Sequence, residues 1–265
     1  MVAGAGDQAA GAVGIGITKP GIASATIGTS GVVFAATDRP TLDPKGRLHT
    51  FCHAIPNRWH VMGVTQAAGL SLKWFRDQFG AVGSKSGSAY EQLSEEASCV
   101  AAGSGGVFWA PYLMGERTPH LDPDARAAFV GLSASHTRAH MVRAILEGVA
   151  FSLKDTFTIF EEIGVPVSQI RLGGGGARSS LWRQIQADAY GQEVEILAAE
   201  EGAAYGAAIL AGVGAGGWKS VDEACDAVVR VTARIPPKPA DKATMQNSYK
   251  TYRRIYPALH SIARA

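Results

Sequence analysis

Four consecutive glycines, Gly173 to Gly176, lie between an apolar segment at 169–172 and a segment of helical pattern at 180–190. The first segment predicts a strand and the second a helix. Because glycine has no Cβ, a ligand approaches its backbone closely, and the free N–H groups at a helix start suit an anion. A plain turn accounts for one or two glycines, so four favour contact with a ligand. Such a junction belongs to folds in which strands and helices alternate.

The rest of the chain continues this alternation. The predicted strands are 22–27, 32–36, 60–65, 169–172 and 194–197. The predicted helices are 8–13, 70–79, 90–100, 138–163, 180–190, 203–211 and 244–262. Segment 2–7 indicates the end of a buried strand that enters a glycine turn. We therefore predict an α/β fold in which residues 1–265 form one domain, with a linker at 236–239 and a terminal helix within 240–265.

The segment 138–163 gives the strongest helical signal. Its apolar residues return to one face at helical spacing, and Gly164 and Pro166 end it. These apolar residues are Val142, Ile145, Leu146, Val149, Leu153, Phe157 and Phe160.

Composition excludes several classes of protein. Glycine makes up 32 of 265 residues, or about 12% against an average near 7%, but without the strict period of collagen. A net charge of +2 gives no basic field for a nucleic acid. No apolar run reaches the roughly 18 residues that span a membrane, and no signal peptide begins the chain. The three cysteines, Cys52, Cys99 and Cys225, form no disulfide or zinc pattern, which favours the cytoplasm.

Two further turns carry polar groups that could bind a ligand. Gly28 to Gly31 joins the strands at 22–27 and 32–36, and its hydroxyls and N–H groups could hold phosphate oxygens. By itself, such a sequence is more often a plain hairpin. Asp7 follows a glycine turn at an expected strand end, where functional carboxylates of α/β folds gather. It is a candidate general base, and the N-cap of the next helix is the alternative.

Common nucleotide-binding motifs are absent from the sequence. Arg178 stands where the last glycine of a dinucleotide fingerprint would be. Trp218 separates the glycines of 212–217 from Lys219 and Ser220, so there is no Walker A loop.

Two polar clusters remain. His136 and His140 have the spacing of a metal pair on a helix, but no third ligand presents itself, and we interpret them as a helix start and surface pair. The loop from Glu116 to His120 is either a structural ion-pair corner or a loop on the substrate side.

Together and in this order, these segments resemble the carboxyl-terminal lobe of the FGGY carbohydrate kinases. Ala127-x-Phe129-x-Gly131-Leu132, seven residues, then His140-Met141-x-x-Ala144-Ile145-Leu146-Glu147 fits the family's second signature throughout. Segments 4–11, 27–31 and 174–179 resemble its other blocks, and 115–123 is most similar to the xylulose-phosphorylating branch. The resemblance covers essentially the whole chain, but only about the second half of a family member.

The resemblance implies an actin-like, ribonuclease-H-like ATPase fold of two lobes, with a mixed sheet flanked by helices. ATP and the sugar would lie in the cleft, with Mg²⁺ as cofactor. Asp7 would contact the sugar and take the proton of its terminal hydroxyl. The nucleotide would be bound by Gly28, Thr29 and Ser30 at the β- and γ-phosphates, by Gly175, Gly176, Ala177 and Ser180 at the adenosine, and by Gly115 nearby.

Family members also carry an amino-terminal lobe with a first phosphate loop and much of the sugar site. We therefore expect a truncated kinase for D-xylulose, with Met1 an introduced or alternative start and with little activity alone. The expected partners are the sugar, the missing lobe and, through exposed apolar surface, a second copy. A kinase for ribulose, gluconate or glycerol, or a non-catalytic actin-like nucleotide-binding module, remains an alternative.

Overall fold

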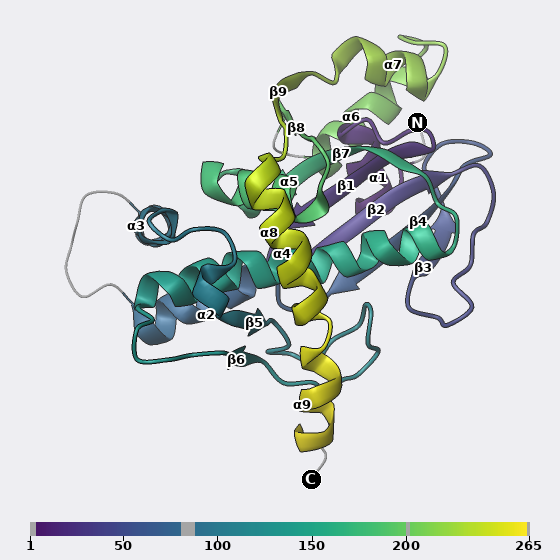
Figure 1. The fold of residues 1–265 in the computed structure, drawn as a ribbon. Helices are drawn as coiled ribbons and strands as arrows, with labels where there is room; N and C mark the ends of the chain where they lie inside the picture. Colours follow the sequence, from purple (N-terminus) through teal and green to yellow (C-terminus); the bar gives the residue numbers. More distant parts are fainter. Residues whose placement is uncertain (1–3, 81–87, 200–201, 264–265) are drawn as a thin grey trace.

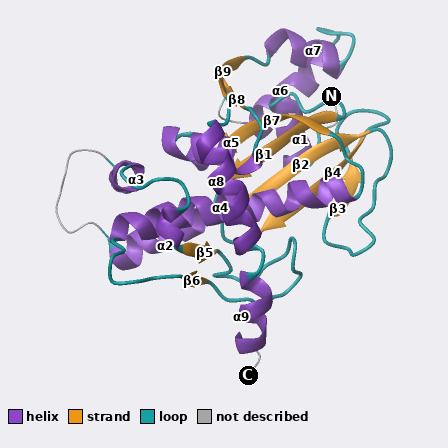
Figure 2. Ribbon diagram, in the orientation of Figure 1, coloured by secondary structure: helices purple, strands orange, loops and turns teal. Residues whose placement is uncertain are grey.

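A mixed β-sheet forms the centre of the protein (Figures 1 and 2). The computed structural model describes residues 4–80, 88–199 and 202–263. Within this part, the strand order is β3 (His49–Cys52), β4 (Trp59–Thr65), β2 (Gly31–Thr37), β1 (Gly21–Ile27), β7 (Val167–Gly174), β8 (Val194–Leu197) and β9 (Val231–Ile235). The β1–β7 and β7–β8 pairs are parallel and the other pairs are antiparallel. The two neighbouring parallel strands β1 and β7 therefore end at the same edge of the sheet.

Both faces of the sheet are covered at β1. Alternate residues of a strand point to opposite sides, and neighbouring residues of β1 are buried on both sides. Ala23, Ala25 and Ile27 of β1 belong to the large core cluster, which also contains the apolar residues of helix α4 (Arg138–Glu162). Ile22 of β1 instead joins a smaller cluster that includes Ala12 of helix α1 (Asp7–Gly14). The sheet thus lies between α4 and α1.

The long helix α4 confirms the strongest sequence prediction. Each of the apolar residues predicted to share one face is buried. Helix α4 also approaches the short strand β5 (Phe108–Ala110) closely, because a Cβ at Gly148 would collide with the carbonyl group of Trp109. Strand β5 pairs with β6 (Ala128–Val130).

Helix α1 packs against α6 (Gly202–Gly214) with almost no side chain between the two backbones. A Cβ at Gly14 would collide with the carbonyl of Gly202, and one at Gly206 with the carbonyl of Ala10. Small residues at these positions therefore allow the close approach.

The remaining helices surround this framework. They are α2 (Gly69–Phe79), α3 (Ala89–Ser98), α5 (Ser180–Tyr190), α7 (Val221–Val228), α8 (Pro239–Tyr252) and α9 (Ile255–Ala263), with short 3₁₀ turns at Ser104–Gly106 and Gly175–Ala177. None of the described helices is long and apolar enough to cross a membrane.

Several sequence predictions need correction. The elements β3, β5, β6, α7 and β9 were not predicted. The expected terminal helix is two helices, because Pro257 fits only the first turn of a helix, and it lies in the first turn of α9, which begins at Ile255. Pro239, assigned to a linker, stands at the start of α8, where its missing N–H costs nothing. Of the strand end expected at 2–7, residues 2 and 3 lie outside the described part, 4–6 are irregular, and Asp7 begins α1.

Candidate active site

A cavity of about 690 Å³ opens where β1 and β7 end. The start of α2, helix α3 and the start of α5 complete its walls. Its lining residues are Ile27, Gly28, Thr29, Gly69, Leu70, Leu72, Lys73, Ser88, Tyr90, Glu91, Ser94, Glu95, Gly175, Gly176, Arg178, Ser179, Ser180 and Trp182. Two glycine turns that are distant in the sequence, one after β1 and one after β7, thus share one cavity.

The turn after β1 is held by backbone hydrogen bonds. The N–H of Gly28 donates to the carbonyl of Ser30 (3.0 Å), and the N–H of Gly69 donates to the carbonyl of Gly28 (2.8 Å). Leu70 donates in the same way to Thr29 (3.1 Å). A Cβ at Gly28 would meet only the carbonyl oxygen of Ser30, at 3.6 Å. The turn is therefore fixed in shape, and protein packing alone does not require glycine at position 28.

The four glycines at the end of β7 have different surroundings. Gly173 and Gly174 belong to β7 itself, and Gly174 pairs with Ile27 of β1. A Cβ at Gly176 would lie 2.6 Å from the Cβ of Ile27, so this glycine permits close strand packing. A Cβ at Gly175 would meet nothing nearer than 3.9 Å. Gly173 and Gly174 do not line the cavity, and contact of the whole run with a ligand stays a prediction.

Helix α5 presents its N-terminus to the same cavity. The hydroxyl of Ser179 caps the helix by accepting a hydrogen bond from the N–H of Trp182 (3.3 Å). It also lies 3.3 Å from the hydroxyl of Ser94 and so connects α5 with α3. Ser180, the first residue of α5, lines the cavity. Free N–H groups at a helix start favour a negatively charged or hydrogen-bonding ligand.

Charged side chains of both signs line the cavity, and sequence reasoning did not single them out as site residues. Lys73 and Arg178 bring positive charge, and Glu91 and Glu95 bring negative charge. The Nζ atom of Lys73 lies 3.0 Å from a carboxylate oxygen of Asp77, and both side chains are largely exposed. Exposed pairs of this kind are weak, so the ammonium is available to an anion in the cavity.

Tyr90 supplies an aromatic wall that was also not predicted. Tyr90 lines the cavity and is 39% exposed. The guanidinium carbon of Arg76 lies over its ring, 4.7 Å from the ring centre. The available sequence signal was the position of Tyr90 two residues after Ser88, the N-cap of α3.

Asp7 is exposed and is the first residue of α1. Gly6 occupies the N-cap position, so the alternative that Asp7 is the N-cap is wrong. One carboxylate oxygen of Asp7 accepts a hydrogen bond from the N–H of Gln8 (2.7 Å). Asp7 does not line the cavity, and its role as the base stays a prediction.

Three other predicted nucleotide ligands do not line the cavity: Ser30, Gly115 and Ala177. Gly115 is buried with φ of +71°, and a Cβ there would lie 2.8 Å from the carbonyl carbon of Pro123. The structure thus gives Gly115 a packing reason to be glycine. The carbonyl of Ala177 accepts a hydrogen bond from Arg183. Contact of these residues with a nucleotide stays a prediction.

The loop beginning at Glu116 is a hydrogen-bonded corner. The Glu116 carboxylate is 3% exposed, and its Oε1 atom accepts hydrogen bonds from the N–H groups of Gln66 (2.9 Å) and Arg117 (2.8 Å). The N–H of Thr118 donates to the carbonyl of Val64 in β4 (3.0 Å). Burial raises the pKa of Glu116 to about 8. No ion pair of Glu116 occurs among the described residues, so the corner is held by backbone donors.

His140 lies in the first turn of α4 and His136 directly precedes its N-cap Thr137, which agrees with their interpretation as a pair at a helix start. The Nδ1 atom of His140 accepts a hydrogen bond from the N–H of Thr137 (3.2 Å) and closes a capping box. The Nδ1 atom of His136 accepts one from the N–H of Ser133 (2.9 Å). Over the described ranges, no group of three potential metal ligands occurs.

The C-terminal domain model of the FGGY family of carbohydrate kinases matches residues 23–215. A xylulose kinase from Bacillus subtilis is 38% identical over 256 residues, which are 97% of this chain and 50% of that protein. A gluconokinase from Bacillus licheniformis is 36% identical over 272 residues, covering 100% of this chain and 51% of that protein. The chain spans about half the length of the curated relatives it matches.

Comparison with solved structures agrees with this result. The structure of a xylulose kinase from Rhodospirillum rubrum matches with a TM-score of 0.88 and 33% sequence identity, over 99% of this chain and 52% of that one. The predicted fold, an actin-like ATPase lobe with a mixed sheet flanked by helices, is thereby confirmed.

Proposed function

Because the chain belongs to the FGGY family of carbohydrate kinases, we propose that it is the nucleotide-binding half of an enzyme that transfers a phosphoryl group from ATP to D-xylulose. The product is D-xylulose 5-phosphate. The observation that carries this proposal is the shared cavity of the two glycine turns after β1 and β7. Relatives named xylulose kinase support the choice of sugar.

The cavity residues fit ATP. Gly28 and Thr29 offer exposed backbone and a hydroxyl to the β- and γ-phosphates, with Ser30 completing the turn. Gly175, Gly176 and Ser180 offer an open strand end and a helix N-terminus to the adenosine, next to Ala177. A rigid turn with free N–H groups stabilises phosphate charge without having to reorganise.

Phosphoryl transfer requires a base for the attacking hydroxyl. We assign this role to Asp7, whose carboxylate takes the proton of the terminal sugar hydroxyl. The hydroxyl oxygen forms a bond to the γ-phosphorus, the bond from that phosphorus to the bridging oxygen breaks, and ADP leaves. Asp7 is exposed at the start of a helix, so a sugar has access to it.

The described residues do not form a metal site of their own. We propose that Mg²⁺ enters with the phosphates of ATP and is placed by an aspartate of an amino-terminal half like that of the relatives. That half would also supply much of the sugar site. By "complete kinase" we mean this chain preceded by such a half. The chain alone should therefore turn over little sugar.

Two further predictions accompany this proposal. We expect the kinase to be cytoplasmic, which the three free thiols of Cys52, Cys99 and Cys225 support. We also expect self-association of the isolated chain through apolar surface, and sedimentation at several concentrations tests it.

Gluconate is the second candidate substrate, because a gluconokinase matches the whole chain almost as well. Coupled ADP-release assays of the complete kinase with xylulose, ribulose, gluconate and glycerol distinguish these sugars and polyols. The proposal requires the highest kcat/KM for xylulose. A higher kcat/KM for another of these compounds would change the proposed substrate but not the proposed class of enzyme. ATP binding without any sugar-dependent ADP release would favour a non-catalytic nucleotide-binding module.

The nucleotide site is testable on the chain itself by calorimetric titration with ATP. Gly28→Ala adds a methyl group that the protein tolerates but that occupies the space before the phosphates. We expect ATP affinity to fall at least about tenfold, or about 1.4 kcal/mol. Gly11→Ala is the matched control, because its Cβ would also find room, with the nearest atom at 3.8 Å, and Gly11 lies outside the cavity. Equal affinities of the two variants would contradict the site.

A further inference from the structure

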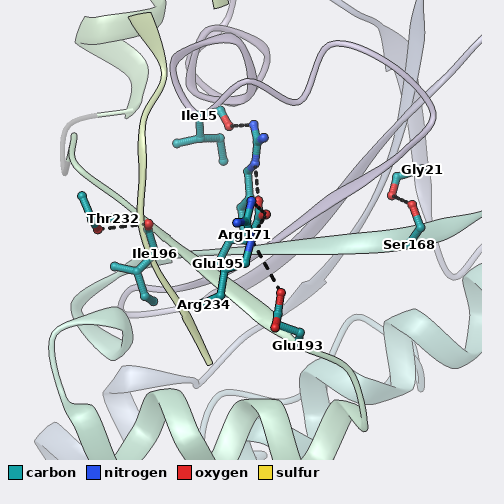
Figure 3. A network of polar contacts seen from close by, with 9 residues as sticks. All are labelled: Ile15, Gly21, Ser168, Arg171, Glu193, Glu195, Ile196, Thr232 and Arg234. Atoms are coloured by element: carbon teal, nitrogen blue, oxygen red, sulfur yellow. Dashed lines mark hydrogen bonds and ion pairs between the residues drawn. The ribbon is translucent and has the colours of Figure 1, made fainter. Parts of the chain in front are cut away.

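Arg171 contacts Ile15 (Figure 3), which lies at the end of α1, the helix that begins with Asp7. Arg171 lies in β7, just before the glycine run. Its Nη1 atom donates a hydrogen bond of 2.6 Å to the carbonyl oxygen of Ile15, which is the C-cap residue of α1. One side chain therefore joins β7, whose end forms part of the cavity, to α1.

A buried carboxylate fixes the guanidinium of Arg171. Its Nε atom lies 3.1 Å from Oε2 of Glu195 in β8, and Glu195 is only 5% exposed. The other oxygen of Glu195 accepts hydrogen bonds of 3.1 Å from Nε and Nη2 of Arg234 in β9. Glu195 thus lies between the two arginines (Figure 3). Charge-assisted hydrogen bonds of this kind hold a planar guanidinium in a defined orientation.

The end of α1 is shaped to receive this guanidinium. Gly16 has φ of +69°, and a Cβ at this position would collide with Nη1 of Arg171. The positive charge also lies at the negative end of the helix dipole, where it stabilises the helix. Gly16 and Arg171 therefore form one fitted contact.

Among the described residues, one other hydrogen bond reaches the end of α1, from Sγ of Cys225 in α7 to the carbonyl oxygen of Val13 (3.3 Å). No hydrogen bond joins α1 to α6 within this part of the chain. The helices approach most closely at Ala10 and Gly14 on α1 and at Gly202 and Gly206 on α6, and Val13 of α1 belongs to the same apolar cluster as Ile209 of α6. Side-chain ridges that fill grooves hold helices along their axes, and the four small residues provide none, so Val13 is the main side chain of α1 that does so here. The hydrogen bond from Arg171 to Ile15 thus supplies a directional restraint that the α6 contact lacks.

We propose that Arg171 is a positioning residue for phosphoryl transfer, a proposal that rests on the proposed function. It holds the C-terminal end of α1 and so sets the place of Asp7 at the other end. The helix is eight residues long, or about 12 Å, so a shift at one end reaches the other. A displacement of about 1 Å at a reacting group costs up to about a hundredfold in rate.

The test compares Arg171→Met, Arg171→Lys and Arg234→Met in the complete kinase. Arg234→Met is the matched control, because it removes a partner of the same Glu195 but leaves the bond to Ile15. We expect Arg171→Met to lower kcat about ten- to a hundredfold, with the Kd for ATP within about threefold of wild type. Arg171→Lys should recover part of the loss, and Arg234→Met should stay within about threefold. Hydrogen exchange of the α1 amides should accelerate in Arg171→Met alone.

A kcat of Arg171→Met within threefold of wild type, or unchanged exchange in α1, would overturn the proposal. An equal loss in Arg234→Met would do the same, because the effect would then come from Glu195. If Arg171→Met does not fold, Arg171→Lys must still show a lower kcat with unchanged ATP affinity. If the wild-type complete kinase uses no ATP in the presence of sugar, the proposed function fails. The exchange of α1 then decides alone whether Arg171 holds this helix.

Discussion

The N–H of Gly69 donates a 2.8 Å hydrogen bond to the carbonyl oxygen of Gly28, and a Cβ at Gly69 would collide with that oxygen. The start of α2 therefore rests directly on the turn proposed to bind phosphate. Backbone bonds from Ala68 and Leu70 to the carbonyl of Thr29 strengthen the contact. The shape of the turn depends on a segment far beyond it in the sequence.

Gly69→Ala should disturb the turn through the carbonyl oxygen of Gly28. The new methyl group must push the Gly28 carbonyl away, which costs about 1–3 kcal/mol as overpacking does. We expect a lower free energy of unfolding and an ATP affinity reduced about tenfold or more. Calorimetric titration and urea unfolding of the chain measure both. Wild-type ATP affinity in a folded Gly69→Ala protein would contradict this dependence.

Gly148→Ala should act on stability alone. Its Cβ would enter the backbone of β5 at Trp109, and neither Gly148 nor Trp109 lines the cavity. We expect the free energy of unfolding to fall by about 1–3 kcal/mol. Denaturant unfolding gives this value, and ATP affinity at a temperature where the variant is folded should match wild type. A variant as stable as wild type would show that α4 and β5 are less tightly packed than the structure has them.

Glu116 should make stability fall as the pH rises. Burial raises its pKa from the ordinary 4.5 to about 8 in the folded protein, and burial likewise raises that of Asp155 from 3.8 to about 7. The folded state thus holds protons that the unfolded state has lost. The stabilisation is fully present below the unfolded pKa values and disappears as the pH passes the folded ones.

Urea unfolding at pH 6.5 and 8.5 checks this sign. We expect a lower free energy of unfolding at pH 8.5, and a smaller difference between the two pH values in Glu116→Gln. His60 and His120, whose pKa values burial lowers from 6.5 to about 4, have the opposite effect. They lower the free energy of unfolding as the pH falls through 6.5, and so reduce the expected difference slightly. A difference that is the same in wild type and Glu116→Gln would assign the pH dependence to other groups.

Sequence reasoning found the elements that are buried on a periodic face. Strands β1 and β2 and helix α4 carry such patterns, so their positions agree closely with prediction. The missed strands β3 and β9 lie at the two edges of the sheet and are mostly exposed. Neighbouring strands, rather than their own alternation, determine that they pair.

The site shows the same division. The turn at 173–176 was visible as a run of glycines, and the turn at 28–31 through the family resemblance. Other cavity residues, such as Gly69, Lys73, Tyr90 and Arg178, come together only through the packing of α2, α3 and α5. The sequence also did not show why single positions require glycine. Gly176 packs against Ile27 and Gly115 against Pro123, and such contacts exist only in the folded chain.

The central claim is that Asp7 is the base of a sugar kinase, and Asp7→Asn in the complete kinase tests it most directly. Its control is Asp241→Asn, which changes an aspartate in the first turn of a different helix, α8. We predict that xylulose-dependent ADP release falls by about a hundred- to ten-thousandfold in Asp7→Asn. The Kd for ATP should stay within about threefold of wild type, and Asp241→Asn should keep its rate. Asp7→Asn turning over xylulose at the rate of Asp241→Asn would contradict the claim.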